Sequence, residues 1–137
     1  MTVRSMIRPM TIDVSVHSSP ILPEDHVPPG SGALVRFEGR VRPEENGKII
    51  EALIYEAYEP MAQNQMKEIL EQLAQSWPCI LARVRHRVGR VPVGDAAIIV
   101  EVFSAHRAEA FALAAAFMDR LKHDVPIWKV DSVIKAQ

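Results

Sequence analysis

The sequence is poor in cysteine, with only Cys79 among its 137 residues. One cysteine excludes a framework of internal disulfides and a metal site built from several thiolates. Cys79 stands between Pro78 and Ile80 without an activating neighbour, so we interpret it as a packing residue. Stability must then come from burial of apolar side chains, and a hydrophobic content of 48% is enough for a core at this length.

Long apolar runs and a large net charge are also absent. No stretch approaches the ~18 apolar residues that indicate a membrane span, and the N-terminal MTVRSMIRPM lacks the apolar segment of a secretory signal. The 16 basic and 17 acidic residues give a net charge of −1, which indicates neither nucleic acid nor an anionic membrane as a partner. We expect a single soluble domain over residues 1–137, located in the cytoplasm.

Common catalytic signatures are missing as well: the chain has no glycine-rich phosphate loop, no HExxH metal motif and no Ser-His-Asp signature. Its candidate chemistry lies instead in residues 104–129, SAHRAEAFALAAAFMDRLKHDVPIWK. Residues 109–118 are apolar on almost every side, which predicts a helix enclosed by its own protein or by a partner. Ser104 is a favourable N-cap for this helix, and Pro126 predicts its end near residues 122–123.

Two cations, His106 and Arg107, fall in the first turn of this predicted helix. A positive charge there opposes the helix dipole, which favours anions at that end. One purpose of such an arrangement is to hold an anion such as phosphate on the free backbone N–H groups. The alternative is two surface side chains that make ordinary salt bridges, and the residues alone leave both interpretations open.

Two lysines, Lys122 and Lys129, lie at the other end of this stretch. A lysine at a helix C-terminus is favoured by the dipole alone. However, Met118 lies one turn before Lys122 on the same helix face, and Trp128 is next to Lys129. A lysine among apolar neighbours can have a lowered pKa and act as an acid, a base or a nucleophile, which makes both lysines candidates for catalysis.

The remaining pattern predicts an α+β domain with a largely antiparallel sheet and two main helices. Residues 1–10 and the proline-rich stretch 17–32 are expected to be irregular. Asn46-Gly47 predicts a turn that joins the second and third strands into a hairpin protruding beyond the main sheet. Hydrophobic patterning predicts strands over Thr11–Val16, Ala33–Val41, Ile49–Tyr58, Ile80–Val88, Ala96–Phe103 and Ile127–Ile134, a first helix over Pro60–Trp77 and a turn-rich link over Val91–Asp95.

Arginines recur with a period of two on two of these strands. Arg83, Arg85 and Arg87 share one face of their strand, and Arg36 and Arg40 share one face of another. Such stripes usually face solvent. We therefore interpret the first stripe and Arg36 as solvated and assign them no chemistry.

Three motifs at matching separations carry a family resemblance. GALVRFEGRVR, SAHR and MDRLKHDVPIWK, with VRHRVG and VPVGD between them, resemble the large, catalytic subunit of molybdopterin synthase. The likeness runs from about Gly32 to Asp131. It implies an α/β hammerhead fold and a sulfurtransferase that converts cyclic pyranopterin monophosphate into molybdopterin by adding two sulfurs.

The resemblance also implies the partners. Sulfur arrives as a thiocarboxylate on the C-terminal glycine of a small ubiquitin-like subunit ending in Gly-Gly. Two large subunits form a homodimer, with one small subunit at each end. No cofactor or metal is expected, because the partner delivers the sulfur and molybdenum enters only after the dithiolene exists.

The same resemblance assigns roles to individual residues. Lys122 matches the essential lysine beside the incoming thiocarboxylate, and Lys129 matches a second active-site lysine. No residue is assigned to a metal. The substrate-binding positions are Arg42, which closes the G-[KR]-V-R motif, the pocket-lining Phe37 and Met118, and His106 and Arg107, which match the pair that helps to bind phosphate and pterin.

Three departures from the family pattern keep alternatives open. The loop after Arg42 is the unusually acidic Pro-Glu-Glu-Asn-Gly, and Asp131 stands where a glutamate is common. The sequence also stops at Gln137, where many relatives continue with a basic and aromatic tail, so we expect weaker substrate binding. The first alternative is therefore a catalytically weak homologue that binds pterin or the partner. The second is an interaction module unrelated to pterin, whose arginine stripes meet an acidic protein.

His106 and Lys122 raise a conflict of distance. Along one helix, at ~1.5 Å per residue, they are separated by roughly 24 Å, and a pterin monophosphate cannot touch both. A two-fold dimer resolves the conflict if it places the His106 end of one copy beside the Lys122 end of the other. We therefore expect a homodimer with a composite active site.

Overall fold

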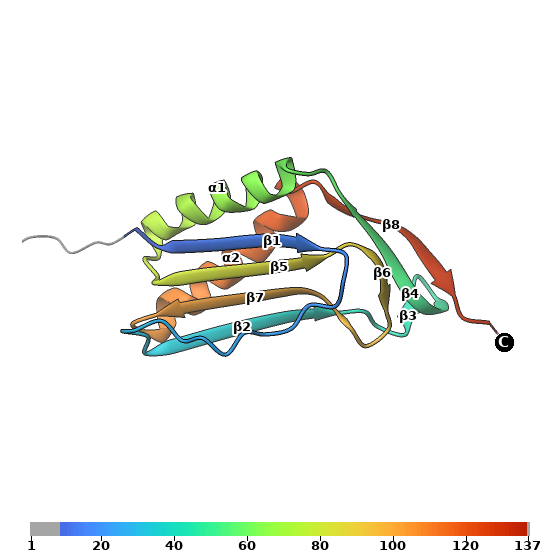
Figure 1. The fold of residues 1–137 in the computed structure, drawn as a ribbon, viewed down its shortest axis with the longest axis horizontal. Coiled ribbons are helices and arrows are strands. Elements are labelled where there is room, and N and C mark those ends of the chain that lie inside the picture. Colours follow the sequence, from blue (N-terminus) through green and yellow to red (C-terminus); the bar gives the residue numbers. More distant parts are fainter. Residues whose placement is uncertain (1–8, 137) are drawn as a thin grey trace, which may run out of the picture.

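The protein folds into two β-sheets and two helices (Figure 1). The structure, a computed structural model, describes residues 9–136. The α+β class and the two main helices expected from the sequence are confirmed. The strands are β1 (Thr11–His17), β2 (Ala33–Arg40), β3 (Glu44–Glu45), β4 (Lys48–Ala57), β5 (Leu81–Arg87), β6 (Gly89–Pro92), β7 (Ala96–Ser104) and β8 (Ile127–Ile134), and the helices are α1 (Met61–Ser76) and α2 (Arg107–Asp124).

The larger sheet has the strand order β1-β5-β7-β2. Only β1 and β5 are parallel in it, and its other two pairs are antiparallel. The smaller sheet is built on β4, which pairs antiparallel with β3, β6 and β8. It projects beyond one end of the larger sheet (Figure 1). The prediction of a largely antiparallel arrangement is therefore confirmed.

Both helices pack on one face of the larger sheet and enclose the main core (Figure 1). In α2 the spacing of Leu113 and Phe117 places both side chains on the buried face, where each contributes about 1.5–3 kcal/mol. Phe111 of the same helix is 60% exposed. The helix that the sequence predicts to be enclosed is therefore covered by its own chain on one side only.

The predicted hairpin between residues 33–41 and 49–58 is wrong. β2 pairs with β7 in the larger sheet, and β4 pairs with the two-residue β3 instead. The turn itself exists, because φ is 52° at Asn46 and 78° at Gly47, as a two-residue type I′ turn requires. Pro43 explains the changed partner: it has no N–H for a strand ladder and lies in the break between β2 and β3.

Two further local predictions differ from the structure. Residues 91–95, expected to be a link, begin inside β6, which pairs with Ala52–Tyr55 of β4. Ser104 is not the N-cap of α2, because the helix starts at Arg107 with His106 as its N-cap. The Ser104 hydroxyl is buried at the end of β7 and donates a hydrogen bond to the His106 carbonyl.

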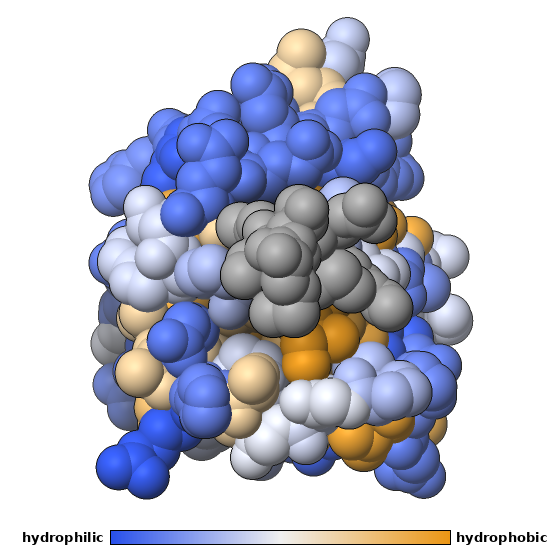
Figure 2. All heavy atoms as spheres, turned by 90° about the vertical axis from the view of Figure 1, so that its left-hand side faces the viewer, coloured by the Kyte–Doolittle hydropathy of each residue, from blue (hydrophilic) through white to orange (hydrophobic). Residues whose placement is uncertain are grey.

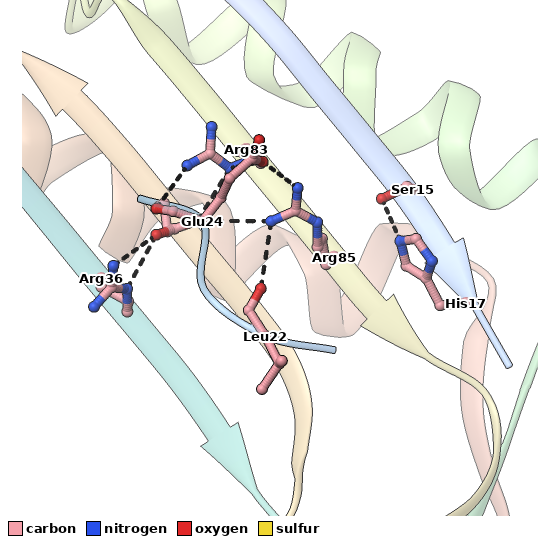
Figure 3. Close-up of polar contacts among 8 residues, drawn as sticks. Ser15, His17, Leu22, Glu24, Arg36, Arg83 and Arg85 are labelled. Carbon is pink, nitrogen blue, oxygen red and sulfur yellow. Dashed lines mark hydrogen bonds and ion pairs between the residues drawn. The ribbon is translucent and has the colours of Figure 1, made fainter. Parts of the chain in front are cut away.

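The stripe of Arg83, Arg85 and Arg87 is not solvated, contrary to expectation: Arg83 and Arg87 are buried and Arg85 is half-buried (Figure 3). Arg36 is exposed, as expected. Strand register places Arg83 beside Glu101, and Glu101 beside Arg36. The fully buried Glu101 carboxylate accepts a bond from Arg83 Nε at 3.1 Å and two from Arg36, at 3.0 and 2.9 Å. Arg87 is also buried and pairs with Asp95 at 2.8 Å. The prediction for Arg83 and Arg87 failed because their counter-charges, Glu101 and Asp95, lie outside the strand that carries these arginines.

Residues 18–32 form neither helix nor strand, as expected, whereas His17, expected to be irregular as well, is the last residue of β1. The part of this segment that carries Leu22 and Glu24 crosses the charged face (Figure 3). Glu24 pairs there with Arg85 and with Arg83, the latter at 3.3 Å. The hydrogen bond from Arg85, and then the charge of Arg83, lower the pKa of the Glu24 carboxyl. Ile21 is buried against the same sheet. Ion pairs and one apolar anchor therefore fix this irregular segment to the sheet.

Within residues 9–136, neither helix is long and apolar enough to cross a membrane. Residues 1–10 were expected to be irregular. Residues 9 and 10 form neither helix nor strand, and residues 1–8 lie outside the described part of the chain.

We predict that Glu101→Gln lowers the free energy of unfolding by about 3 kcal/mol, because it leaves the buried Arg83 with only the partly exposed Glu24 as a counter-charge. Urea unfolding should show a lower midpoint with an unchanged m-value. The matched control is Glu38→Gln, which removes an exposed ion pair with Arg40 and should cost less than about 1 kcal/mol. Equal costs for the two variants would contradict the structural role of the buried pair.

Candidate functional site

Most of the predicted site residues lie at or near the two ends of α2 (Figure 1). His106 and Arg107 are at its N-terminal end, directly after β7. Lys122 is in its last turn, at the end from which the chain enters β8. The candidate residues therefore form two separate groups within one chain.

The N-terminal group presents two exposed side chains, the imidazole of His106 and the guanidinium of Arg107, beside backbone amides that no side chain caps. His106 is the N-cap, with φ −127° and ψ 150°, and its side chain makes no capping hydrogen bond. Arg107 is the first helical residue. Uncapped N–H groups and the positive end of the helix dipole favour an anion at this place. Both side chains can add hydrogen bonds and charge to a bound phosphate.

Cys79 lies in a hollow at the same end of the molecule, between β1 and the end of α1. Figure 2 shows this end, with hydrophilic residues gathered over α1 and hydrophobic ones reaching the surface lower down. Burial, and second the charge of Glu109, raise the pKa of the Cys79 thiol to about 11. The thiol is therefore protonated at neutral pH, which supports its interpretation as a packing residue. Among residues 9–136, no three His, Cys, Asp or Glu side chains are grouped so that they could hold a metal ion.

The C-terminal group brings the two lysines to one end of the molecule. Lys122 is exposed, and Met118, one turn earlier, is half-buried against the main core. The buried Val125 follows the helix, and Pro126 begins the return of the chain. Lys129 is then the third residue of β8. The end of α2 and the start of β8, which carry the two lysines, lie next to each other in the chain and in the fold (Figure 1).

Phe37 and Arg42 lie on the path from the larger to the smaller sheet. Phe37 shares a strand face with Val35, which packs against the main core, so it points to the side that the helices cover. It is 38% exposed there. Arg42 follows β2 and is accessible in an open depression of about 410 Å³, which it lines together with Pro43, Glu44, Asn46 and Gly47.

Lys129 has two polar neighbours that the sequence did not indicate. Its Nζ lies 3.4 Å from Oε2 of Glu45 and donates a hydrogen bond to it. Tyr55 is its register partner on β4, and burial, and second the charge of Glu45, raise the pKa of this phenol. The ring of His86 meets Tyr55 edge-on at 5.3 Å between centroids. Side chains from β3, β4 and β8 thus converge, and the pattern of a single strand cannot reveal such a cluster.

Within one chain, the structure therefore brings together only part of the predicted site. Lys122, Lys129 and Met118 share one end of α2. His106 and Arg107 lie at the other end, roughly 24 Å away along the helix axis. One copy of the chain cannot place both groups on the same small molecule.

Comparisons with known proteins agree on one family. The family model of the MoaE protein matches residues 11–124. The human molybdopterin synthase catalytic subunit is 44% identical over 103 residues, which cover 75% of this chain and 55% of that protein. The catalytic subunit from Thermoplasma volcanium is 39% identical over 103 residues, which cover 75% of each chain. This chain thus spans about half the length of the human relative.

The fold is also similar to that of a solved relative. The crystal structure of molybdopterin synthase from Staphylococcus aureus matches with a TM-score of 0.75 at 29% identity. The match covers 95% of this chain and 98% of that one. The expected α/β hammerhead is therefore confirmed.

We predict that Glu45→Gln lowers the pKa of Tyr55, because it removes the negative charge that disfavours the phenolate. The pKa should stay above the ordinary value of 10.0, since burial is the larger cause and remains. Ultraviolet titration of phenolate in a Tyr58→Phe background isolates Tyr55, because the chain has 2 tyrosines. An unchanged titration midpoint would show that the Glu45 carboxylate does not face Tyr55, and Glu51→Gln serves as the charge-matched control.

Proposed function

Because this chain belongs to the MoaE protein family, we propose that it is a catalytic subunit of molybdopterin synthase. The proposed reaction is a sulfur transfer in molybdenum cofactor biosynthesis, which converts cyclic pyranopterin monophosphate into molybdopterin. The sulfur donor is a small ubiquitin-like subunit that carries a thiocarboxylate on its terminal Gly-Gly. The observation that carries the proposal is the pair Lys122 and Lys129, held at one end of α2 on separate elements.

The two lysines suit the chemistry of a thiocarboxylate. Attack by its sulfur on a substrate carbon displaces an oxygen bound to that carbon, and this oxygen takes up a proton as it leaves. The sulfur then bridges the substrate and the partner's terminal glycine as a thioester. Water then attacks the thioester carbonyl, releases the partner as a carboxylate and leaves the sulfur on the substrate. The ammonium groups of Lys122 and Lys129 stabilise the anionic oxygen and supply or accept protons in these steps.

The N-terminal end of α2 suits the other part of the substrate, its phosphate. We assign His106 and Arg107 to phosphate and pterin binding, because they add a hydrogen-bonding imidazole and a guanidinium to uncapped helix amides. Phe37, Met118 and Arg42 are assigned to the substrate pocket. These roles come from the family motif, and the exposure of Arg42 and Phe37 leaves both side chains accessible.

A second copy of the chain completes the proposed site. The two ends of α2 are too far apart for one substrate, and the exposed Phe111 leaves an apolar side of α2 without a cover. A two-fold dimer can bury this side and bring His106 of one copy towards Lys122 of the other. One small subunit at each end then gives a heterotetramer.

The proposal needs no resident metal or cofactor, because the sulfur arrives already activated on the partner. We place the reaction in the cytoplasm. The fold depends on no disulfide, since its only cysteine, Cys79, is a free buried thiol.

The structure argues against the alternative hypothesis of an interaction module that binds an acidic protein. It required solvated arginine stripes that meet an acidic protein. Arg83 and Arg87 are instead buried and paired inside the chain, and Arg85 is paired with Glu24. The catalytically weak homologue differs from the leading proposal in rate alone, so turnover separates the two.

We predict that Lys122→Ala abolishes dithiolene formation, a fall of about 100-fold or more, because the thiocarboxylate loses its proton-transfer and charge-stabilising partner. The assay mixes the purified protein with the thiocarboxylated small subunit and cyclic pyranopterin monophosphate. The unfolding midpoint and the oligomeric state should stay unchanged, since Lys122 is exposed and makes no ion pair within residues 9–136.

The matched control is Lys67→Ala, which removes an exposed lysine from α1 and should leave the rate unaltered. Near-normal turnover by Lys122→Ala would refute the role of this lysine. Binding of the substrate and the small subunit without turnover by the wild-type protein would favour the weak homologue.

A further inference from the structure

The ion pair between Lys129 and Glu45 joins two strands that are not paired with each other in the sheet. Lys129 is in β8 and Glu45 is in β3, and both strands pair with β4. The Ile49 carbonyl accepts a hydrogen bond from Lys135 after β8, whereas the next N–H, of Ile50, donates to Pro43 before β3. These two groups belong to one peptide unit, whose C=O and N–H point to opposite edges of a strand, so β8 and β3 lie on opposite edges of β4. The ion pair therefore crosses the face of β4.

The Glu45 carboxylate is more firmly positioned than the Lys129 ammonium. Glu45 immediately precedes the tight Asn46-Gly47 turn, and the bond from the Ile50 N–H to the Pro43 carbonyl, at 3.0 Å, closes the hairpin behind it. The Glu45 side chain is only 21% exposed, compared with 50% for Lys129. A lysine ammonium sits on a flexible four-carbon stem. The carboxylate is therefore the fixed member of the pair.

We propose that Glu45 is a positioning residue for Lys129 in sulfur transfer, an inference that rests on the proposed function. An ammonium group has three N–H donors. One donor is directed to Glu45, which leaves the others for the thiocarboxylate of the incoming partner. The half-buried phenol of Tyr55, opposite Lys129 in register, borders the same place. The acidic hairpin thus orients the catalytic amine before the partner arrives.

A purely stabilising role does not account for this pair. Partly exposed ion pairs contribute little to folding. The same sheet holds a pair of equal length, in which Arg90 lies 3.4 Å from Glu51, with side chains 52% and 45% exposed. This second pair involves no candidate site residue, so it is a control matched in charge and in length, although Glu51 is more exposed than Glu45.

If Glu45 instead competes with the partner for Lys129, its removal should have the opposite effect on the rate. If the Glu45 carboxylate occupied the place of the thiocarboxylate on Lys129, its removal would strengthen partner binding and raise the rate at low partner concentration. A positioning role predicts a lower rate with little change in partner binding. The two roles are therefore separated by kcat and by KM for the small subunit.

The experiment measures kcat and KM for the thiocarboxylated small subunit with saturating cyclic pyranopterin monophosphate. Glu45→Gln should lower kcat about fivefold, as expected for loss of a partly exposed ion pair, and change KM less than about twofold. Glu51→Gln should leave both values unaltered. In single turnover, Glu45→Gln should cause no further loss in a Lys129→Ala background, because the effect passes through the lysine.

Three outcomes overturn the inference. The first is a kcat of Glu45→Gln equal to or above that of the wild type, the second is an equal loss in Glu51→Gln, and the third is the same fivefold loss in the Lys129→Ala background. A wild-type protein that forms no product overturns the proposed function and this inference together. An active wild type with an unimpaired Glu45→Gln variant overturns the positioning role alone.

Discussion

The length of α2 is the constraint on which the proposed site depends. Its 18 residues form one continuous helix, which spans roughly 27 Å and cannot bend its ends together. The anion-binding features lie at the start of this helix and the lysines at its end. A small phosphorylated substrate can use both sets only if a second copy supplies one of them. The exposed apolar side of α2, marked by Phe111, gives such a copy a surface on which to pack.

Ion pairing inside the chain decides which of its many cations remain for chemistry. Glu101 neutralises the buried Arg83 and holds Arg36, while Asp95 pairs with Arg87. These arginines stabilise the larger sheet and the segment that crosses it. Lys122, His106 and Arg107 make no such ion pairs within the described part of the chain. Lys129, near the start of β8 in the smaller sheet, follows the end of α2 that carries Lys122. Glu45 in the hairpin orients the ammonium group of Lys129.

Much of the fold could be predicted because strand alternation and helical periodicity are local. The six long strands and both helices have their expected places, whereas β3 and β6 were missed because two and four residues carry no pattern without their partner β4. Ion pairs between residues far apart in the sequence could not be predicted either: Glu101 is 65 residues from Arg36, and Lys129 is 84 residues from Glu45. The motif could therefore name site residues, but only the assembled sheets show which neighbours each one has.

The measurement that tests the shared site most directly is complementation between two inactive variants, Arg107→Ala and Lys122→Ala. Mixed dimers carry one site with both defects and one site with neither, because each site takes its two ends from different copies. The account predicts that mixing, followed by subunit exchange, restores up to about half of the wild-type activity per mixed dimer. Confirmed mixed dimers that remain inactive would contradict it, and either the phosphate role of Arg107 or the dimer geometry would have to be abandoned.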